Sequence, residues 1–181
     1  MGIYGQKREK EYLKQVAWRS YARSAEAWNR GMDEFASRIE AKVDQRGRVA
    51  IPAPFRSVLA QEGADEIHCY PHLDYDAIEA GGARLVEEIK GIVGRQPAGS
   101  QEREALEIVY FGECEKLKID PDGRTVLPKR LRDHAGITET AVFVGLGNKF
   151  QIWEPEAYNK FRERAREQAL ALRRELGAGN R

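Results

Sequence analysis

Apolar residues occupy every second position along SRIEAKVD, residues 37–44. A period of two residues predicts a strand with one buried face. The turn sequence DQRG follows at 44–47, and RVAIP at 48–52 resumes an extended run. We therefore expect the two extended runs to pair with each other as a β-hairpin.

Other stretches have the periodicity of helices. Helices are predicted at 52–60, 83–95, 100–112, 128–136 and 155–176. One stripe of the last helix holds Tyr158, Phe161, Ala165, Ala169 and Leu172. AVFVG and FQIWE, on either side of LGNK, predict a further hairpin, whose aromatic residues Phe143, Phe150 and Trp153 we expect in the core. Together these elements predict an α+β fold.

The chain contains an internal repeat. DPDGRTVLP at 120–128 resembles DQRGRVAIP at 44–52, at an offset of 76 residues. The same offset, without a gap, aligns further pairs on both sides, from Phe35 with Phe111 to Arg56 with Arg132. A register kept over this length indicates a duplicated unit.

Each copy reads Asp-x-x-Gly-Arg-x-x-aliphatic-Pro. Aspartate can bond its own backbone, glycine supplies a positive φ, and proline suits the first turn of the helix that follows. The residues in these structural positions are Asp44, Gly47, Pro52, Asp120, Gly123 and Pro128. One such unit cannot bury its own apolar face, so completing a core is by itself a sufficient reason for the duplication.

Charge is distributed unevenly along the chain. The net charge is +1, but residues 1–31 carry seven Lys or Arg against three Glu, so the remainder is net negative. A nucleic-acid site in the main body must therefore be a local cluster of basic residues. No long apolar window and no apolar leader are present, so we expect a cytoplasmic protein without a membrane partner.

The fold does not require arginine after the turn glycine, at Arg48 and Arg124. These side chains can pair with Asp44 and Asp120, or they can contact phosphates and guanine edges of DNA. The residues alone leave both roles open and slightly favour DNA contact. The first copy adds Arg46 where the second has an aspartate, so we expect the first repeat to dominate recognition.

The segments DQRGRVAIPAPFR, DPDGRTVLPKRLRDHAGI and VFVGLGNKFQIWEPEAY together resemble the MraZ family, bacterial regulators built from two AbrB-like repeats. The resemblance covers residues 32–158. It implies a duplicated swapped-hairpin AbrB-like β-barrel with flanking helices, in which the repeats form an intramolecular pseudo-dimer. It also implies a ring-like homo-oligomer, associated with the nucleoid, that binds double-stranded DNA at promoter direct repeats upstream of the division and cell-wall gene cluster.

The DNA contacts of the family fall on the Gly-Arg turns, so the resemblance assigns DNA binding directly to Arg48 and Arg124. Arg46 matches a position that is usually lysine in the family. Weaker matches complete the expected DNA-binding set: Lys42, Arg56, Lys129 and Arg132. For Lys129 and Arg132 the alternative is that they only solvate a face of the helix that follows the turn.

The resemblance also divides the chain. The expected parts are an extension at 1–31, AbrB-like repeats at 38–86 and 112–157, a helical connection at 87–111, and a C-terminal helix at 158–181. Family members begin close to MDEFASRIEAK, so we expect Met32 to be the true start and residues 1–31 to be a misassigned reading frame. The alternative is a basic N-terminal helix that adds phosphate contacts.

Other kinds of site receive less support. HCYPH has metal-ligand residue types, but no second cluster completes a four-ligand site, so we expect no metal. Neither Cys69 nor Cys114 has an evident orienting group for a cysteine–histidine nucleophile, so we expect free thiols, and no enzyme, cofactor or small-molecule substrate. The second function candidate is an antitoxin-like AbrB module that binds a protein through the helix at 155–176, without specific DNA binding.

Overall fold

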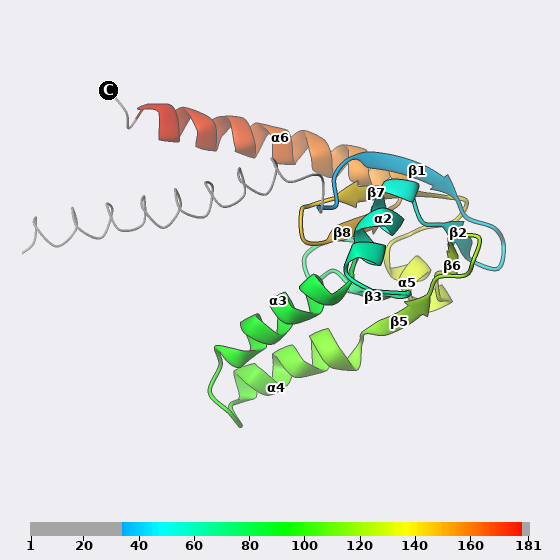
Figure 1. Ribbon diagram of the computed structural model, residues 1–181. Coiled ribbons are helices and arrows are strands. Elements are labelled where there is room, and N and C mark those ends of the chain that lie inside the picture. The colour runs from blue at the N-terminus through cyan, green and yellow to red at the C-terminus, as the bar shows by residue number, and fades with distance from the viewer. Residues whose placement is uncertain (1–33, 179–181) are drawn as a thin grey trace, which may run out of the picture. The chain divides into compact units, whose positions relative to one another are not determined.

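The computed structural model of this protein describes residues 34–178, which form a mixed α+β structure, as predicted (Figure 1). The predictions for residues 1–31 lie outside this range. The strands are β1 (Arg38–Lys42), β2 (Arg48–Ala50), β3 (Glu66–Pro71), β4 (Ala77–Gly81), β5 (Glu115–Lys118), β6 (Arg124–Val126), β7 (Thr140–Gly145) and β8 (Phe150–Trp153). The helices are α2 (Ala53–Gln61), α3 (Ala83–Gly94), α4 (Gln101–Glu107), the π-helix η1 (Ile108–Gly112), α5 (Lys129–His134) and α6 (Pro155–Ala178).

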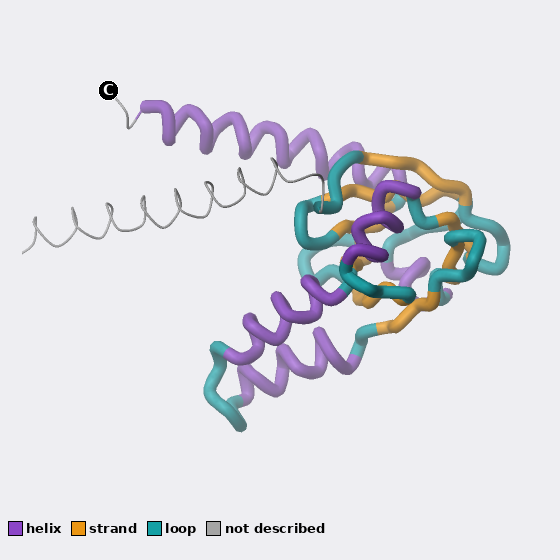
Figure 2. The backbone as a smooth tube through the Cα atoms, viewed as in Figure 1, coloured by secondary structure: helices purple, strands orange, loops and turns teal. Residues whose placement is uncertain are grey.

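The strands form two antiparallel sheets in which the repeats are interleaved. The larger sheet has the order β1-β7-β8-β4-β3-β5, and the smaller one pairs β2 with β6. Strands of the first repeat therefore pair with strands of the second at β1–β7, β3–β5, β4–β8 and β2–β6. Figure 2 shows the strands gathered in one body.

The predicted hairpin between residues 37–44 and 48–52 is wrong. Only the Val43–Val49 bridge joins the two runs; before and after it, β1 pairs with β7 and β2 pairs with β6. The physical reason is that an isolated two-stranded hairpin buries little apolar surface, whereas each strand gains a partner and a core from the other repeat. The turn between the runs forms as predicted.

The exchange of strands is reciprocal. In the β2–β6 pair, Val49 lies opposite Thr125, its counterpart at the offset of 76 residues. The pairing of β1 with β7 has an equivalent in the pairing of β5 with β3. The two copies therefore make matching contacts with each other.

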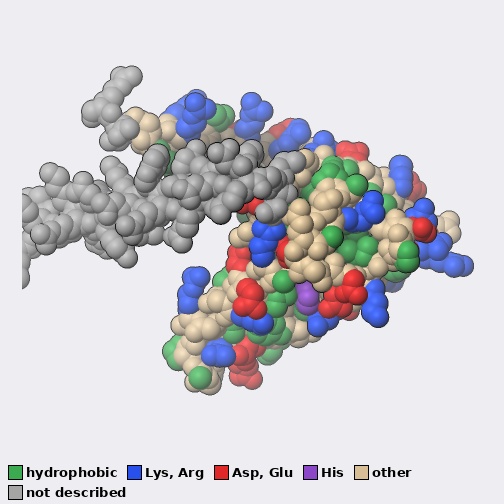
Figure 3. Space-filling model, viewed as in Figure 1, with side chains coloured by type: hydrophobic (Ala, Val, Ile, Leu, Met, Phe, Trp, Pro, Cys, Tyr) green, Lys and Arg blue, Asp and Glu red, His purple; other side chains and the backbone are tan. Residues whose placement is uncertain are grey.

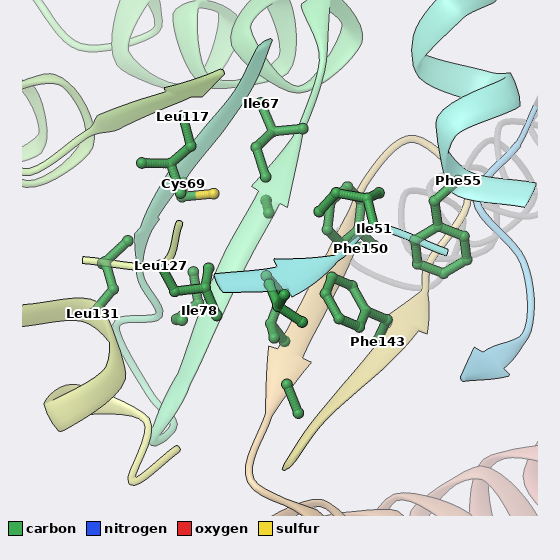
Figure 4. Close-up of a cluster of buried hydrophobic side chains, with 14 of the residues drawn as sticks. Ile51, Phe55, Ile67, Cys69, Ile78, Leu117, Leu127, Leu131, Phe143 and Phe150 are labelled. Atoms are coloured by element: carbon green, nitrogen blue, oxygen red, sulfur yellow. The ribbon is translucent and has the colours of Figure 1, made fainter. Parts of the chain in front are cut away.

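The main core receives side chains from both repeats. Phe55 of α2 and Leu131 of α5 are fully buried at equivalent positions. Phe55 packs on Phe143 and Phe150, with ring centroids 6.3 Å and 5.1 Å away. The predicted core positions Phe143, Phe150 and Trp153 are confirmed. Figure 4 shows side chains from α2, α5 and strands of both repeats converging in this core.

Helices α3 and α4 lie side by side, outside the strands (Figure 2). They confirm the helices predicted at 83–95 and 100–112, although the second ends as a π-helix. The β3–β4 hairpin, the counterpart of β7–β8, was not predicted. The aligned pair Phe35 and Phe111 is not equivalent in structure, because Phe35 is 1% exposed and Phe111 is 46% exposed. Among the described helices, none is long and apolar enough to cross a membrane.

Candidate nucleic-acid interface

The first Gly-Arg turn is built around the carboxylate of Asp44. Its Oδ1 accepts hydrogen bonds from the backbone N–H groups of Arg46, at 2.8 Å, and Arg48, at 2.9 Å. Gly47 has a φ of +82°, and its N–H donates to the Asp44 carbonyl at 2.9 Å. Arg48 Nε donates to Asp44 Oδ2 at 2.8 Å. The hydrogen bonds that the Asp44 carboxylate accepts lower its pKa below the ordinary value, and the bond from the Arg48 side chain has the largest effect.

The second turn repeats the backbone geometry without the ion pair. Asp120 Oδ1 accepts a hydrogen bond from the Arg124 N–H at 2.7 Å, and Gly123 has a φ of +77°. Within residues 34–178, the Arg124 guanidinium has neither an ion pair nor a hydrogen bond. The pairing with aspartate that the sequence allowed at both turns is therefore found at one of them: Arg48 is paired with Asp44, and Arg124 is not paired with Asp120.

The tertiary structure pairs β2 with β6 in one two-stranded ribbon (Figure 1), and each strand begins with one of the two arginines. Its inward positions are Val49 and Thr125, which are 1% and 3% exposed. The neighbouring positions point outward, so Arg48 and Arg124 lie on the same exposed face, diagonally across the ribbon. Ala50 stands opposite Arg124 on that face and leaves the guanidinium uncrowded.

Each turn is held by the backbone of the opposite repeat. The Gly47 carbonyl accepts a hydrogen bond from the Leu127 N–H at 2.9 Å. The Gly123 carbonyl accepts the equivalent bond from the Ile51 N–H, also at 2.9 Å. Each Gly-Arg turn is therefore held by a backbone hydrogen bond from the other repeat as well as by the hydrogen bonds to its own aspartate.

Two of the predicted DNA-binding arginines cover these turns. A Cβ atom at Gly47 would lie 2.9 Å from Arg132 Nε, which also donates to the Leu127 carbonyl at 3.1 Å. A Cβ at Gly123 would meet the guanidinium of Arg56. Sequence reasoning assigned Arg56 and Arg132 no part in holding the turns, whereas the structure places each against the turn of the other repeat.

The remaining candidates for DNA contact are Lys42, Arg46 and Lys129. Lys42, whose Nζ donates to Thr140 Oγ1 at 3.2 Å, lines a shallow concavity together with Arg48 and Arg124. Arg46 lines an adjacent concavity with Arg48. Lys129 lies on α5, where it forms an ion pair with Asp133 at 2.5 Å.

The surface around the first turn is basic with carboxylates interspersed. Figure 3 shows Lys and Arg side chains, with an acidic group among them, at the edge where the β1–β2 turn lies. On strand β1, which leads into this turn, Arg38 forms an ion pair with Glu40 at 2.6 Å, and this pair neutralises part of the positive charge. Lys42, Arg46, Arg48 and Arg124 together form the kind of local basic cluster that a nucleic-acid site in a near-neutral chain would need.

A carboxylate, a histidine and a cysteine lie in a row on strand β3 and next to β5. His68 Nε2 is 3.8 Å from Glu66 Oε1, and His68 Nδ1 is 3.9 Å from Cys114 Sγ. Sequence reasoning missed Glu66 as an orienting group. Burial raises the pKa of the Cys114 thiol, which keeps it protonated at neutral pH, so the row does not fit an activated nucleophile.

Comparison with known proteins identifies the family. A family model described as "MraZ protein, putative antitoxin-like" matches residues 110–175. "Transcriptional regulator MraZ" of Azorhizobium caulinodans is 47% identical over 149 residues, which cover 82% of this chain and 95% of the relative. The chain belongs to the MraZ family. The MraZ regulator of Xanthobacter autotrophicus is 46% identical over 147 residues, covering 81% of this chain and 94% of the relative.

More distant MraZ relatives span the same length. "Transcriptional regulator MraZ" of Rickettsia canadensis is 38% identical over 149 residues, which cover 82% of this chain and all of the relative. The resemblance read from the sequence motifs is therefore confirmed. The family model for MraZ includes the second Gly-Arg turn and the greater part of α6.

Proposed function

We propose that this MraZ-family protein is a sequence-specific, DNA-binding transcriptional regulator whose reading surface is the β2–β6 ribbon. The observation that carries the proposal is the position of Arg48 and Arg124 on one exposed face of a two-stranded antiparallel ribbon. The major groove of B-DNA admits such a ribbon, and arginine binds guanine edges or phosphates with two parallel hydrogen bonds. The names of the MraZ relatives, all transcriptional regulators, support the same role.

We assign different roles to the candidate residues. Arg48 and Arg124 contact DNA from the centre of the face, and Lys42 and Arg46 supply phosphate contacts beside them. Arg56 and Arg132 hold the turns in place and contact phosphate with their free N–H groups. Lys129 contributes least, because it lies on α5, outside the β2–β6 ribbon and the two turns.

The interleaved sheets support a swapped-hairpin AbrB-like architecture in which the chain is an intramolecular pseudo-dimer. In this proposal the repeats are residues 38–86 and 112–157, the helical connection is 87–111, and the C-terminal part is 158–181, of which residues 179–181 lie outside the described range. The consequence for function is that both repeats contribute to one ribbon. One chain therefore presents a single reading surface with two arginines, rather than two separate tips.

A single chain offers few phosphate contacts, so strong binding requires several linked surfaces. We propose a ring-like homo-oligomer that binds tandem direct repeats in the promoter upstream of the division and cell-wall gene cluster. Boxes separated by about one helical turn, ~10 bp, face the same side of the duplex and meet successive chains. Linked sites raise the overall affinity without any new contact.

The second candidate function is an antitoxin-like module that binds another protein without specific DNA binding. Two observations favour it: the wording of the family description, and the exposed leucines Leu172 and Leu176 on the far part of α6. This candidate predicts that α6, rather than the β2–β6 ribbon, is the surface on which activity depends.

The deciding experiment is a gel-shift titration of the chain on the DNA upstream of its own gene, beside a scrambled duplex, at two salt concentrations. We expect laddered complexes that resist the scrambled competitor, and a log–log salt dependence with a slope of about −0.9 per neutralised phosphate. Arg48→Ala should reduce the preference for the specific duplex, while Arg95→Ala, at the exposed C-terminal end of α3, should retain it. Equal binding of both duplexes by the unaltered chain would contradict the proposal and favour the protein-binding candidate.

A further inference from the structure

The C-terminal helix α6 carries one apolar stripe, and only its first part is covered by the protein. Tyr158 is 9% exposed, and Phe161 stacks on Trp153 with ring centroids 4.8 Å apart. Helical spacing continues the same stripe through Ala165 and Ala169 to Leu172 and Leu176. Leu172 and Leu176 are 56% and 72% exposed. A stripe that covers the body at one end and is bare at the other indicates a second binding partner.

The charges beside the bare part of the stripe are mainly positive. Helical spacing places Arg162, Arg166 and Arg173 in a row along one side of it. Residues 162–177 hold five arginines and three glutamates in total. Two such segments brought together would oppose arginine with arginine, so pairing of α6 with another α6 is disfavoured.

A surface of complementary character lies on α4 and η1, and we call it the α4 patch. It consists of Ala105, Ile108 and Phe111, with Glu102 and Glu104 at its edge. Ile108 and Phe111 are 58% and 46% exposed, and Glu104 lies one helical turn before Ile108 on the same face. Within residues 34–178, neither Glu102 nor Glu104 forms an ion pair.

The two large apolar side chains of the α4 patch face solvent. Large exposed apolar side chains set among charges are typical of interaction surfaces. The other face of α4 is already occupied, because Leu106 and Tyr110 pack with α3 in a separate core. The patch is therefore available to a partner without any rearrangement of the helical hairpin.

We propose that residues 165–177 of α6 in one copy of this chain dock on the α4 patch of a second copy. The leucines cover Ile108 and Phe111, and the arginine row faces Glu102 and Glu104. This inference rests on the homo-oligomer of the proposed function and names the surfaces that build it. Because the two surfaces differ, the interface is head-to-tail, and such an interface continues from copy to copy until it closes as a ring.

The arrangement leaves the DNA-reading surface unobstructed. Neither α6 nor the α4 patch includes a residue of the two Gly-Arg turns or of the β2–β6 ribbon. Every copy added to the assembly therefore contributes one further ribbon with its two arginines. The oligomer and the DNA contact can be measured independently for the same reason.

The test is sedimentation velocity of the full chain without DNA. One variant, Leu172→Glu with Leu176→Glu, removes the α6 surface; a second, Ile108→Glu with Phe111→Glu, removes the α4 patch. Leu170→Glu is the matched control, because Leu170 is 43% exposed on the same helix but lies away from the stripe. We expect an oligomer for the unaltered chain and for the control, and monomers for each double variant.

Mixing the two double variants gives the sharper result, since each retains the surface that the other has lost. We expect the mixture to form a 1:1 dimer and no larger species. An oligomer that persists in either double variant, or a mixture that stays monomeric, would overturn the α6–α4 interface while leaving the proposed function standing. A monomeric unaltered chain would overturn the oligomer of the proposed function as well, and would direct attention to an unrelated protein as the partner of α6.

Discussion

Arg132 of the second repeat lies against Gly47 of the first, across the boundary between the two copies. Its Nε donates to the carbonyl of Leu127, whose own N–H donates to the Gly47 carbonyl. Two features of this position require glycine. Its φ is +82°, and a Cβ would lie 2.5 Å from the Leu127 carbonyl oxygen. The Gly-Arg turn is therefore a contact between repeats as well as a loop that displays an arginine.

We expect Gly47→Ala to destabilise the protein by about 3 kcal/mol, since it adds a collision with backbone to an unfavourable φ. Gly63→Ala is the matched control, because Gly63 has a φ of +70° and no atom within 4 Å of the new Cβ. That change should cost only about 1 kcal/mol. Urea unfolding measures both, and equal losses would contradict the contact between repeats.

Gly123→Ala should fall between these two values. Its new Cβ collides with the guanidinium of Arg56, a flexible side chain that can move aside. We therefore expect the added substitution Arg56→Ala to recover part of the stability lost at Gly123. The double variant is compared with both single variants by urea unfolding; purely additive losses would show that Arg56 does not press on the turn.

Both ribbon arginines should be needed for DNA affinity. We expect Arg48→Ala and Arg124→Ala each to weaken binding by about 1–3 kcal/mol, roughly five- to 150-fold. The loss should be larger for Arg48, because Arg46 adds a second basic group to its turn. Fluorescence anisotropy on the operator duplex, with Arg95→Ala as the control, measures this; an equal or larger loss for Arg124 would refute the dominance of the first repeat.

We expect Tyr70 to contribute to stability, because its hydroxyl bonds the buried carboxylate of Glu79. The Tyr70 hydroxyl donates a hydrogen bond to Glu79, which is 6% exposed and also accepts from Lys149 Nζ at 3.0 Å. Burial, followed by this hydrogen bond, raises the pKa of Tyr70 above its ordinary value. Tyr70→Phe should cost about 2 kcal/mol, because it takes a donor from a buried charge.

The matched control for Tyr70→Phe is Tyr110→Phe. The two rings meet edge to face, with centroids 5.4 Å apart, but within residues 34–178 the Tyr110 hydroxyl makes no hydrogen bond. Its removal should change the free energy of unfolding by less than about 0.5 kcal/mol. A loss as large as that of Tyr70→Phe would contradict the special role of the Glu79 contact.

Mild acid should destabilise the protein through two histidines. Burial lowers the pKa of both His68 and His72 below the ordinary value. The unfolded chain then binds more protons than the folded one as the pH falls through about 6.5, so stability is present above that pH and is lost below it. We expect the Tm to fall between about pH 7.5 and about pH 5.5, a window in which ordinary carboxylates stay ionised.

The double variant His68→Gln with His72→Gln tests the origin of this fall. Glutamine cannot take up the proton, so the Tm of the variant should depend less on pH across the same window than that of the unaltered chain. Differential scanning calorimetry at both pH values measures the slopes. Identical slopes would assign the effect to other groups.

The sequence by itself determined the local structure of this protein. Helical periodicity set α3 and α6, and the Asp-x-x-Gly-Arg motif set the two turns, because turn geometry depends on glycine and aspartate side chains within a few residues. The duplication also located Arg48 and Arg124 as candidates. The motifs that carry these features were sufficient to recognise the MraZ family.

Only the tertiary structure decided which strands pair. An alternating pattern such as that of β1 shows that one face of the strand is buried. It does not identify the neighbouring strand, because any strand edge of suitable register can satisfy the hydrogen bonds. The predicted pairing of β1 with the run at 48–52 was therefore wrong, and β1 pairs with β7. The exchange of strands between repeats brought Arg48 and Arg124 onto one face and set Arg56 and Arg132 against the opposite turns. Contacts of this kind depend on residues far apart in the chain, and the free energy of burying a shared core selects among them.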